Sequence, residues 1–247
     1  MYTQDEIDMI LNRFKNNDTF TCAFLVACFT GMRTGEVCAL TWDNIDIEKR
    51  IININHNVYS KVKDEKGKWF LGTTKTINGV RKVYICDTLL IALKNYKKKQ
   101  ENFRKLYGKK YYYYHLEKVK NKYGKIIEYR IVKTIKKSKF LENFNLVFRK
   151  ENGIYSGTDI VKYPYKVVHT ELGIENCRFY DLRGSYATKS LRNGVEIRDV
   201  ADILGHSKIE ATENYYVTTT EDSLKEASEK FEQTVQSDVI DEIIKYE

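Results

Sequence analysis

The chain has 247 residues, of which 42% are apolar and 13% aromatic, and its formal net charge is +8. This length permits one large domain or at most two small ones, and the apolar content argues against a disordered chain. No apolar run approaches the roughly 20 residues of a transmembrane helix, and the N-terminus is acidic where a secretory signal is basic. We therefore expect a cytoplasmic protein that does not contact a membrane.

The first 42 residues predict three helices. Thr3 and Glu6 have the spacing of a capping box, and the apolar residues behind them follow a helical period: Ile7, Ile10, Leu11 and Phe14. Residues 20–29 are apolar nearly all round, which is typical of a central helix. This helix should stop at Thr30-Gly31, and a short helix should begin after Thr34-Gly35 and run to about residue 42.

The next segment predicts strands. Residues 51–55, 68–71 and 80–85 alternate in polarity or are β-branched, and turn signals stand at Gly67 and Asn78-Gly79. These three runs predict a small three-stranded antiparallel sheet. We interpret the cations of this region as solvated charges at strand edges: Lys61, Arg81 and Lys82. A helix should then begin at Thr88, with four side chains directed inward: Leu89, Leu90, Leu93 and Tyr96.

The positive charge is concentrated in residues 97–139. This basic block holds 16 Lys or Arg against three Glu, so it carries +13 and the rest of the chain carries −5. Because lysines here alternate with aromatic residues, the block suits a polyanion such as DNA, although a lysine-rich solvated surface is the open alternative. We expect an insertion with an extra β-hairpin around Tyr123-Gly124, and these DNA-binding candidates: Lys97, Lys98, Lys99, Lys109, Lys110, Lys136 and Lys137.

The C-terminal third is again helical. Helices over residues 178–192 and 196–204 should end at Asn193-Gly194 and at Gly205. A second capping box, Ser207 with Glu210, should open a helix that carries Tyr215. One proline and no low-complexity linker leave no domain boundary, so the sequence predicts a single α+β domain over residues 1–247, mostly helical with the small sheet.

The tail, residues 221–247, holds two apolar clusters on either side of the polar stretch Gln236-Ser237-Asp238. We predict that the first cluster (Leu224, Ala227 and Phe231) packs locally, and that the second reaches a neighbouring protomer: Val239, Ile240, Ile243 and Ile244. The alternative is that the tail folds back onto its own domain.

The cysteines predict no metal site. The five of them form no CxxC pair and no zinc spacing with the four histidines. An odd number among apolar neighbours fits reduced thiols that pack as small hydrophobes: Cys22, Cys28, Cys38, Cys86 and Cys177.

Four separated segments point to one chemistry. Arg33 lies in Gly31-Met32-Arg33-Thr34-Gly35-Glu36, and Lys75 lies at the tip of a predicted β-hairpin. Arg183 follows Tyr180 at the spacing of an H-x-x-R pair, and His206 stands in Leu204-Gly205-His206, nine residues before Tyr215. The first two segments are weak when taken alone, whereas the last two are specific. In combination and in this order they resemble the tyrosine recombinase (phage integrase) family, over about residues 2–231.

The resemblance implies site-specific cleavage and rejoining of duplex DNA by an integrase of a mobile element, with no metal or other cofactor. Tyr215 would be the nucleophile that forms a 3′-phosphotyrosyl link. Arg33 and Arg183 would bind the two non-bridging phosphate oxygens, because guanidinium forks match that geometry. Lys75 would protonate the leaving 5′-hydroxyl and His206 would donate to a phosphate oxygen. Glu36 should orient Arg33 rather than meet the substrate.

One position departs from the family pattern: Tyr180 stands where the first His of H-x-x-R is usual. A phenol with a pKa of about 10 cannot act as a base near neutral pH, but it can hydrogen-bond to a phosphate oxygen. Tyr180 thus supports one alternative, a non-catalytic DNA-binding remnant. A second alternative, an enzyme similar to type IB topoisomerases, stays open because that class uses similar chemistry.

The resemblance also implies partners. Family members act as homo-oligomers on DNA, a tetramer coupled through C-terminal tails, with accessory DNA-bending or excision factors. They carry a separate N-terminal domain that clamps the other face of the DNA. Because this chain begins at the first catalytic helix, we expect it to be a piece of a longer protein without that domain.

Overall fold

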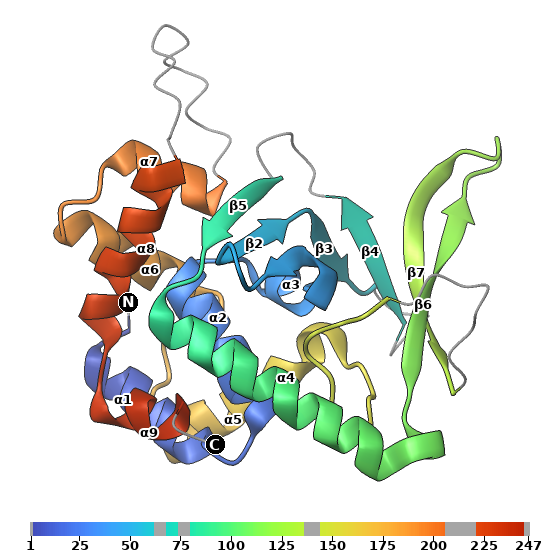
Figure 1. The fold of residues 1–247 in the computed structure, drawn as a ribbon, viewed down its shortest axis with the longest axis horizontal. Coiled ribbons are helices and arrows are strands. Elements are labelled where there is room, and N and C mark those ends of the chain that lie inside the picture. The colour runs from blue at the N-terminus through green and yellow to red at the C-terminus, as the bar shows by residue number, and fades with distance from the viewer. Residues whose placement is uncertain (1, 62–67, 74–79, 136–143, 206–220, 245–247) are drawn as a thin grey trace, which may run out of the picture.

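The computed structural model describes residues 2–61, 68–73, 80–135, 144–205 and 221–244. Its helices and strands form an α+β fold, with helices gathered on one side of two small antiparallel sheets (Figure 1). The α-helices are α1 Gln4–Phe14, α2 Asp18–Thr30, α3 Thr34–Cys38, α4 Asp87–Tyr107, α5 Lys162–Glu171, α6 Asp181–Arg192, α7 Ile197–Leu204, α8 Glu221–Val235 and α9 Asp238–Ile244. The 3-10 helices are η1 Trp42–Asn44, η3 Gly108–Lys110 and η4 Gly157–Val161. The strands are β1 Ile45–Asp46, β2 Ile51–Ile54, β3 His56–Tyr59, β4 Trp69–Thr73, β5 Arg81–Tyr84, β6 Tyr113–Lys120 and β7 Ile126–Thr134. The predicted fold class is confirmed.

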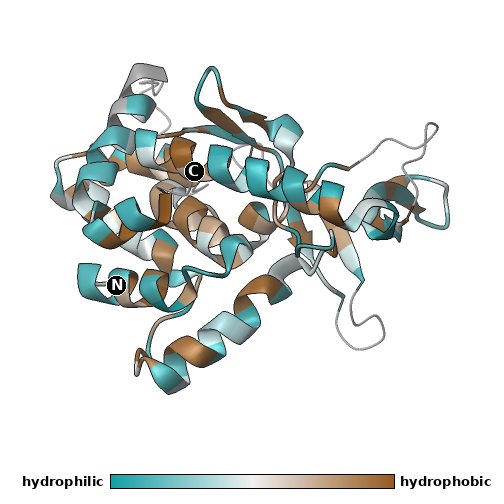
Figure 2. Ribbon diagram, turned by 60° about the horizontal axis from the view of Figure 1, so that its bottom comes forward, coloured by the Kyte–Doolittle hydropathy of each residue, from teal (hydrophilic) through white to brown (hydrophobic). Residues whose placement is uncertain are grey.

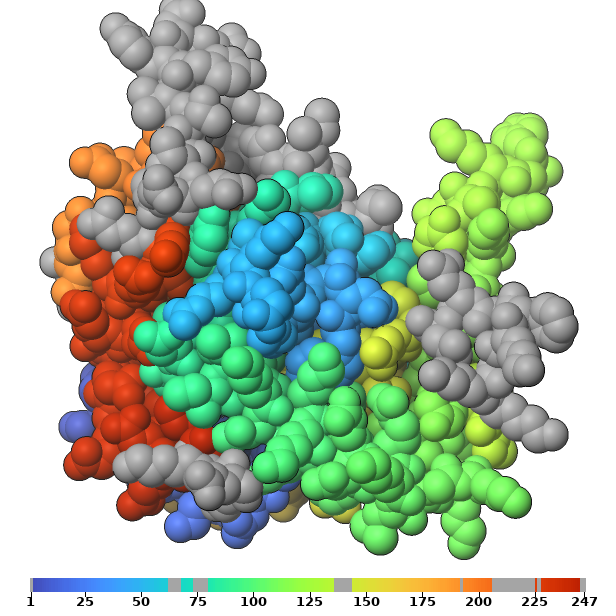
Figure 3. Space-filling model, viewed as in Figure 1, coloured from blue at the N-terminus to red at the C-terminus, as the bar shows by residue number. Residues whose placement is uncertain are grey.

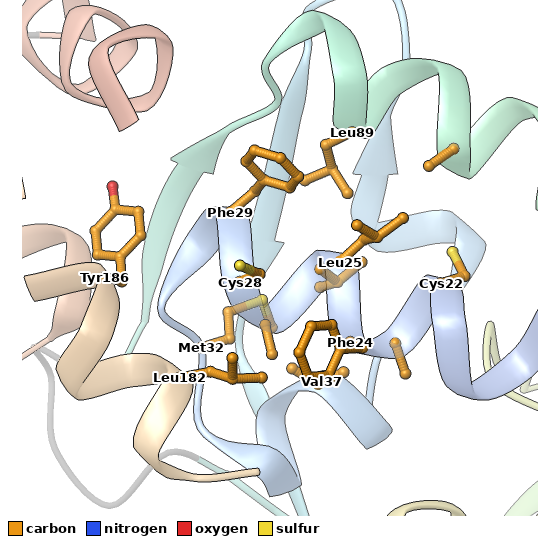
Figure 4. Close-up of a cluster of buried hydrophobic side chains, with 14 of the residues drawn as sticks. Cys22, Phe24, Leu25, Cys28, Phe29, Met32, Val37, Leu89, Leu182 and Tyr186 are labelled. Atoms are coloured by element: carbon orange, nitrogen blue, oxygen red, sulfur yellow. The ribbon is translucent and has the colours of Figure 1, made fainter. Parts of the chain in front are cut away.

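The central helix is α2, as its sequence predicted. Every residue from Phe20 to Thr30 is buried, and helices α4 and α6 pack against it (Figure 1). Figure 4 shows the cluster around it, where Phe29 faces Leu89 of α4 and Met32 lies beside Leu182 of α6. This core fixes where α2 ends, and the end of α2 carries the first candidate site residue.

The prediction of the three-stranded sheet is wrong for one of its strands, β4. The observed sheet has the order β1-β2-β5, and β4 belongs instead to a four-stranded sheet of order β3-β4-β7-β6. The physical reason is the apolar face of β4, because Trp69 and Leu71 bury themselves with Ile131 of β7 in a second core cluster. Strand β1 has only two residues, too few for an alternation to be recognised in the sequence. Strand β3, which has four, was not predicted either.

The predicted extra hairpin is confirmed as β6 and β7, which stand away from the body of the molecule (Figure 3). The basic block spans three kinds of element, because residues up to Tyr107 continue α4 without a break, followed by η3 and the hairpin. Figure 2 shows α4 with a hydrophilic outer face over most of its length. The block is therefore built into the fold: Gln100, Tyr111 and Tyr114 within it are buried.

The tail packs on its own chain. Phe231 of α8 is buried against Phe29 and Tyr186, as predicted for the first cluster. The second cluster does not reach outward, however, because Ile240 and Ile244 of α9 are buried where α9 packs against α1 and α4. The carbonyl of Ile244 also accepts a hydrogen bond from Asn95 of α4. In the structure of the single chain, the prediction that this cluster docks outside its own core is wrong.

Helix α5 and η4 were not predicted at all.

The five cysteines are free and buried, in agreement with their interpretation as small hydrophobes. None of the described helices is long and apolar enough to cross a membrane.

Candidate functional site

The first part of the site is the turn between α2 and α3. Gly31 ends α2 in the left-handed conformation with φ of 62°, and its N–H donates to the carbonyl of Ala27 at 3.0 Å. A Cβ atom at this position would lie 2.6 Å from Leu204 Cδ2. Glycine is therefore required by backbone conformation and by the approach of α7. The chain leaves this turn at Arg33, the residue that caps α3.

Glu36 holds Arg33 in place. The Arg33 backbone N–H donates to Glu36 Oε2 at 2.8 Å, and Arg33 Nη1 donates to Glu36 Oε1 at 2.7 Å. The Arg33 side chain is 37% exposed, whereas that of Glu36 is only 2% exposed. The Arg33 guanidinium is thus bound to Glu36 through Nη1 and remains partly exposed.

Arg81 of β5 binds the same carboxylate and was missed by the sequence interpretation. Its Nη1 and Nη2 donate to Glu36 Oε1 and Oε2 at 3.1 and 2.8 Å, and its Nε donates to the carbonyl of Ile203 in α7. The interpretation of Arg81 as a solvated strand-edge charge is wrong, since its side chain is 6% exposed. The available signal was the period of two, which places Arg81 on the same face as the buried Val83 and Ile85.

These contacts determine the charge of Glu36. Burial alone would raise the pKa of this carboxyl, but the hydrogen bonds and charge of Arg81 and the hydrogen bonds of Arg33 outweigh it. The pKa of Glu36 is therefore lowered, and the group is a carboxylate at neutral pH. One buried anion thus joins α3 and β5, and through Arg81 also α7.

Arg183 of α6 lies at the same site, although it is 152 residues from Gly31 in the sequence. It is 3% exposed, and its Nη1 and Nη2 donate to the carbonyls of Gly31 at 2.9 Å and Leu204 at 2.6 Å. Burial, followed by the charges of Arg33 and Arg81, lowers the pKa of Arg183 to about 10. Among the described residues, three cations against one carboxylate make this a site that favours an anion.

The α7 terminus completes the described part of the site. Gly205 caps α7 in the left-handed conformation, and its carbonyl accepts a hydrogen bond from Arg33 Nη2 at 3.3 Å. Arg33 and Arg183, distant in sequence, therefore converge on the Leu204-Gly205 turn. Tyr180, the residue before α6, is 51% exposed. Its phenol lies near enough to Arg183 to favour the charged form of that guanidinium.

Three of the predicted catalytic residues lie outside the described residues: Lys75, His206 and Tyr215. The helix expected to carry Tyr215 lies outside them as well. The structure therefore brings together Arg33, Glu36, Arg183 and Tyr180 of the predicted set and adds Arg81.

The predicted DNA-binding lysines divide into three groups. Lys97 and Lys98 are exposed on α4, and Lys109 and Lys110 are exposed in η3. Lys99 instead forms an ion pair with Asp18 at 2.7 Å. Lys136 and Lys137 lie outside the described residues. In the part of the chain that the structure describes, no group of three or more His, Cys, Asp or Glu side chains could hold a metal ion.

Comparison with known proteins identifies the family. The model of the phage integrase family matches residues 1–222. The chain belongs to the phage integrase family. Among curated relatives, a XerC-like tyrosine recombinase of Caldanaerobacter subterraneus is 29% identical over 220 residues, which are 87% of this chain and 49% of that protein. The transposase of transposon Tn916 from Enterococcus faecalis is 24% identical over 228 residues, which are 90% of this chain and 48% of that protein.

Solved structures of family members share the fold. The integrase of transposon Tn1549, in complex with a circular intermediate DNA, superposes with a TM-score of 0.58 at 20% identity, covering 93% of this chain and 65% of that one. The XerA recombinase gives a TM-score of 0.52 at 20% identity, covering 91% and 62%. The chain spans about half the length of the curated relatives it matches.

Proposed function

We propose that this chain is the catalytic part of a site-specific DNA recombinase that integrates or excises a mobile element. The observation that carries the proposal is the meeting of Arg33 and Arg183 at the turn that leads directly into His206. The negative charge of Glu36 is balanced by Arg33 and Arg81. Two guanidinium groups in such a place suit a phosphodiester, whose transition state gains negative charge on two non-bridging oxygens. Relatives named as recombinases, transposases and integrases support the same reaction.

In the proposed mechanism, Tyr215 attacks the phosphorus, a covalent 3′-phosphotyrosyl bond forms and the bond to the 5′-oxygen breaks. Lys75 gives the departing 5′-oxygen its proton, and the reverse steps rejoin a new strand. Arg33 and Arg183 act on the phosphate oxygens, and a preorganised donor of this kind contributes about 3 kcal/mol to lowering the barrier. Glu36 and Arg81 act through Arg33, because their contacts fix its direction.

Tyr180 takes the place of an imidazole in this scheme. Its exposure and its closeness to Arg183 suit a hydrogen bond from the phenol to a phosphate oxygen. In the proposal Tyr180 is therefore a hydrogen-bond donor and not a base.

The test is recovery of a covalent complex from a library of randomised duplexes that each carry one nick. After denaturation, the protein-linked DNA is isolated and the attached peptide is identified by mass spectrometry. We expect the adduct on Tyr215, its loss in Tyr215→Phe and its retention in Tyr216→Phe, the matched control. DNA retention without an adduct would instead mean a DNA-binding remnant, and an adduct on Tyr216 would mean that the motif register is wrong.

A second assay separates the recombinase from the topoisomerase-like alternative. Two duplexes that carry the selected sequence are incubated with the protein, and a relaxable supercoiled plasmid serves as the parallel substrate. Exchange of strands between the duplexes supports the recombinase. Relaxation of the plasmid without exchange supports the alternative.

A further inference from the structure

A second group of arginines lies away from the Arg33–Arg183 site and shares no residue with it. Arg104 lies in the last turn of α4. Arg149 follows Asn145 and Val147, which hydrogen-bond to Trp42 and Leu40, and its own carbonyl accepts a hydrogen bond from Thr19 of α2. Both guanidinium groups lie over the ring of Tyr111, at 5.9 and 5.5 Å from its centroid. Tyr111 itself is fully buried. Two cations are thus held beside one aromatic ring at the base of the β6–β7 hairpin.

Neither arginine has an anionic partner among the described residues. Arg149 is 3% exposed, and its Nη2 donates only to neutral oxygens, Gln100 Oε1 at 3.0 Å and Asn145 Oδ1 at 3.4 Å. Burial, followed among the lowering causes by the charge of Arg104, lowers the pKa of Arg149. A buried charge without a counterion is costly, and proteins retain one where a ligand supplies the opposite charge.

The unpaired donors point to the kind of ligand. The Nε atoms of Arg104 and Arg149 and the hydroxyl of Tyr111 are all buried and have no hydrogen-bond partner among the residues that the structure describes. The arginines line a pocket of about 200 Å³ together with Asp43, Tyr113, Tyr114, Phe144 and Asn145. Because a water molecule occupies about 30 Å³ of liquid, this volume admits a tetrahedral oxyanion with its first waters.

Gln100 explains why Arg149 is held in this direction. Its Oε1 accepts from both Trp42 Nε1 and Arg149 Nη2, and its Nε2 donates to the carbonyl of Val147 at 2.6 Å. With both ends of the amide engaged, Gln100 cannot neutralise the guanidinium. It can only orient it.

We propose that the pocket between Arg104 and Arg149 is a phosphate-binding site. The two guanidinium groups bind the oxygens of one phosphate, and the phosphate ties the end of α4 to the base of the hairpin. The phosphate comes either from the DNA backbone or from a free phosphate compound. Asp43 is exposed at the mouth of the pocket, so its carboxylate competes with the ligand and weakens its binding.

The test uses thermal unfolding in sodium phosphate against sodium chloride of equal ionic strength. All variants carry Arg33→Gln as the background, because this change removes one cation of the Arg33–Arg183 site, where phosphate would also bind. In this background we expect about 50 mM phosphate to raise the Tm by about 5 °C. Adding Arg104→Gln should abolish the rise, whereas Lys105→Gln, the exposed neighbour in the same turn, should leave it intact. Arg104 is chosen because Arg149 is buried and its replacement endangers the fold.

Three results would overturn the proposal: no rise in Tm, an equal rise with Arg104→Gln, or an Asp43→Asn variant that is destabilised in chloride and shows no larger rise. The last would mean that Asp43 is the counterion of the arginines. To identify the source of the phosphate, the salt dependence of DNA binding is measured for the unaltered chain and for the chain that carries only Arg104→Gln. A fall of about 0.9 in the salt slope of log K with Arg104→Gln identifies a DNA phosphate, and an unchanged slope with the Tm effect intact identifies a free one.

Discussion

Replacement of Arg81 by methionine tests whether the Glu36 carboxylate holds the Arg33–Arg183 site together. Arg81 is the more buried of the two cations bound to Glu36. Its loss removes two hydrogen bonds to that carboxylate and one to the carbonyl of Ile203. Breaking a buried ion pair from one side costs about 3–5 kcal/mol. Because Arg33 remains bound to Glu36, we expect the lower end, about 3 kcal/mol, which corresponds to a fall in Tm of about 6–12 °C.

The assay is urea and thermal unfolding of three variants. Lys82→Met changes the exposed next residue of β5 and should stay within about 0.5 kcal/mol of the unaltered chain. Arg81→Lys should be intermediate, because an ammonium keeps the charge but cannot donate to both carboxylate oxygens and to Ile203 together. A double-mutant cycle of Arg81→Met with Glu36→Gln should show a coupling of about 1–3 kcal/mol. If Arg81→Met unfolds like Lys82→Met, the carboxylate does not organise this site and the proposed role of Arg81 is wrong.

The other predictions concern titration, the substituted position, the basic block and the tail. The lowered pKa of Glu36 means that its contribution to stability is complete above its ordinary pKa of about 4.3 and is lost as the pH falls through the lower folded value. An acid unfolding midpoint unchanged by Glu36→Gln would contradict this. Tyr180→His should preserve or raise cleavage in the covalent-trapping assay, and a loss of more than tenfold, about 1.4 kcal/mol, would show that the pocket depends on the phenol. Changing Lys97, Lys98, Lys109 and Lys110 to Gln should lower the salt slope of DNA binding by about 0.9 for each phosphate that is no longer neutralised, while an unaltered slope would make the block a solvated surface. Truncation after Asp238 should destabilise a dilute monomer by about 3 kcal/mol or more, because Ile240 and Ile244 lose their burial, and a monomer of unchanged Tm would restore the prediction of docking on a neighbour.

Local patterns predicted the elements that depend on local chemistry. The capping box of α1 forms as expected, since Thr3 Oγ1 accepts from the Glu6 N–H and Glu6 accepts from the Thr3 N–H. The hairpin of β6 and β7 forms around Gly124, which has a φ of 80°. Helix α5 was missed because Pro164 suggests a break and Val167-Val168 a strand. Proline is acceptable there only because it falls in the first turn of the helix, where its missing N–H costs no hydrogen bond.

Pairing between distant elements could not be predicted, because it depends on which apolar faces meet. Strand β4 has the same alternation in either sheet, and its place is fixed by the burial of its apolar face, including the packing of Trp69 over Gly157. A Cβ atom at Gly157 would lie 2.2 Å from Trp69 Cδ2. The tail shows the same limit. Its break at residues 236–238 was recognised, but the groove that α9 fills lies between α1 and α4, two helices more than 70 residues apart in sequence.

The family motif includes Arg33 and Arg183 but not the residues that hold these two cations close together. The spacing of Arg33, Arg183 and His206 identifies a family, but it says nothing of what keeps two cations close together. Their mutual repulsion must be offset, and the buried carboxylate of Glu36 offsets it only because Arg81 arrives from β5 and compensates the cost of burying that anion. Arg81 is also the first residue of β5, the strand that follows residues 74–79, the predicted hairpin tip with Lys75. A ligand that shifts β5 would therefore shift Arg33 through a single shared carboxylate, and the geometry of the Arg33–Arg183 site depends on a residue that carries no recognisable motif.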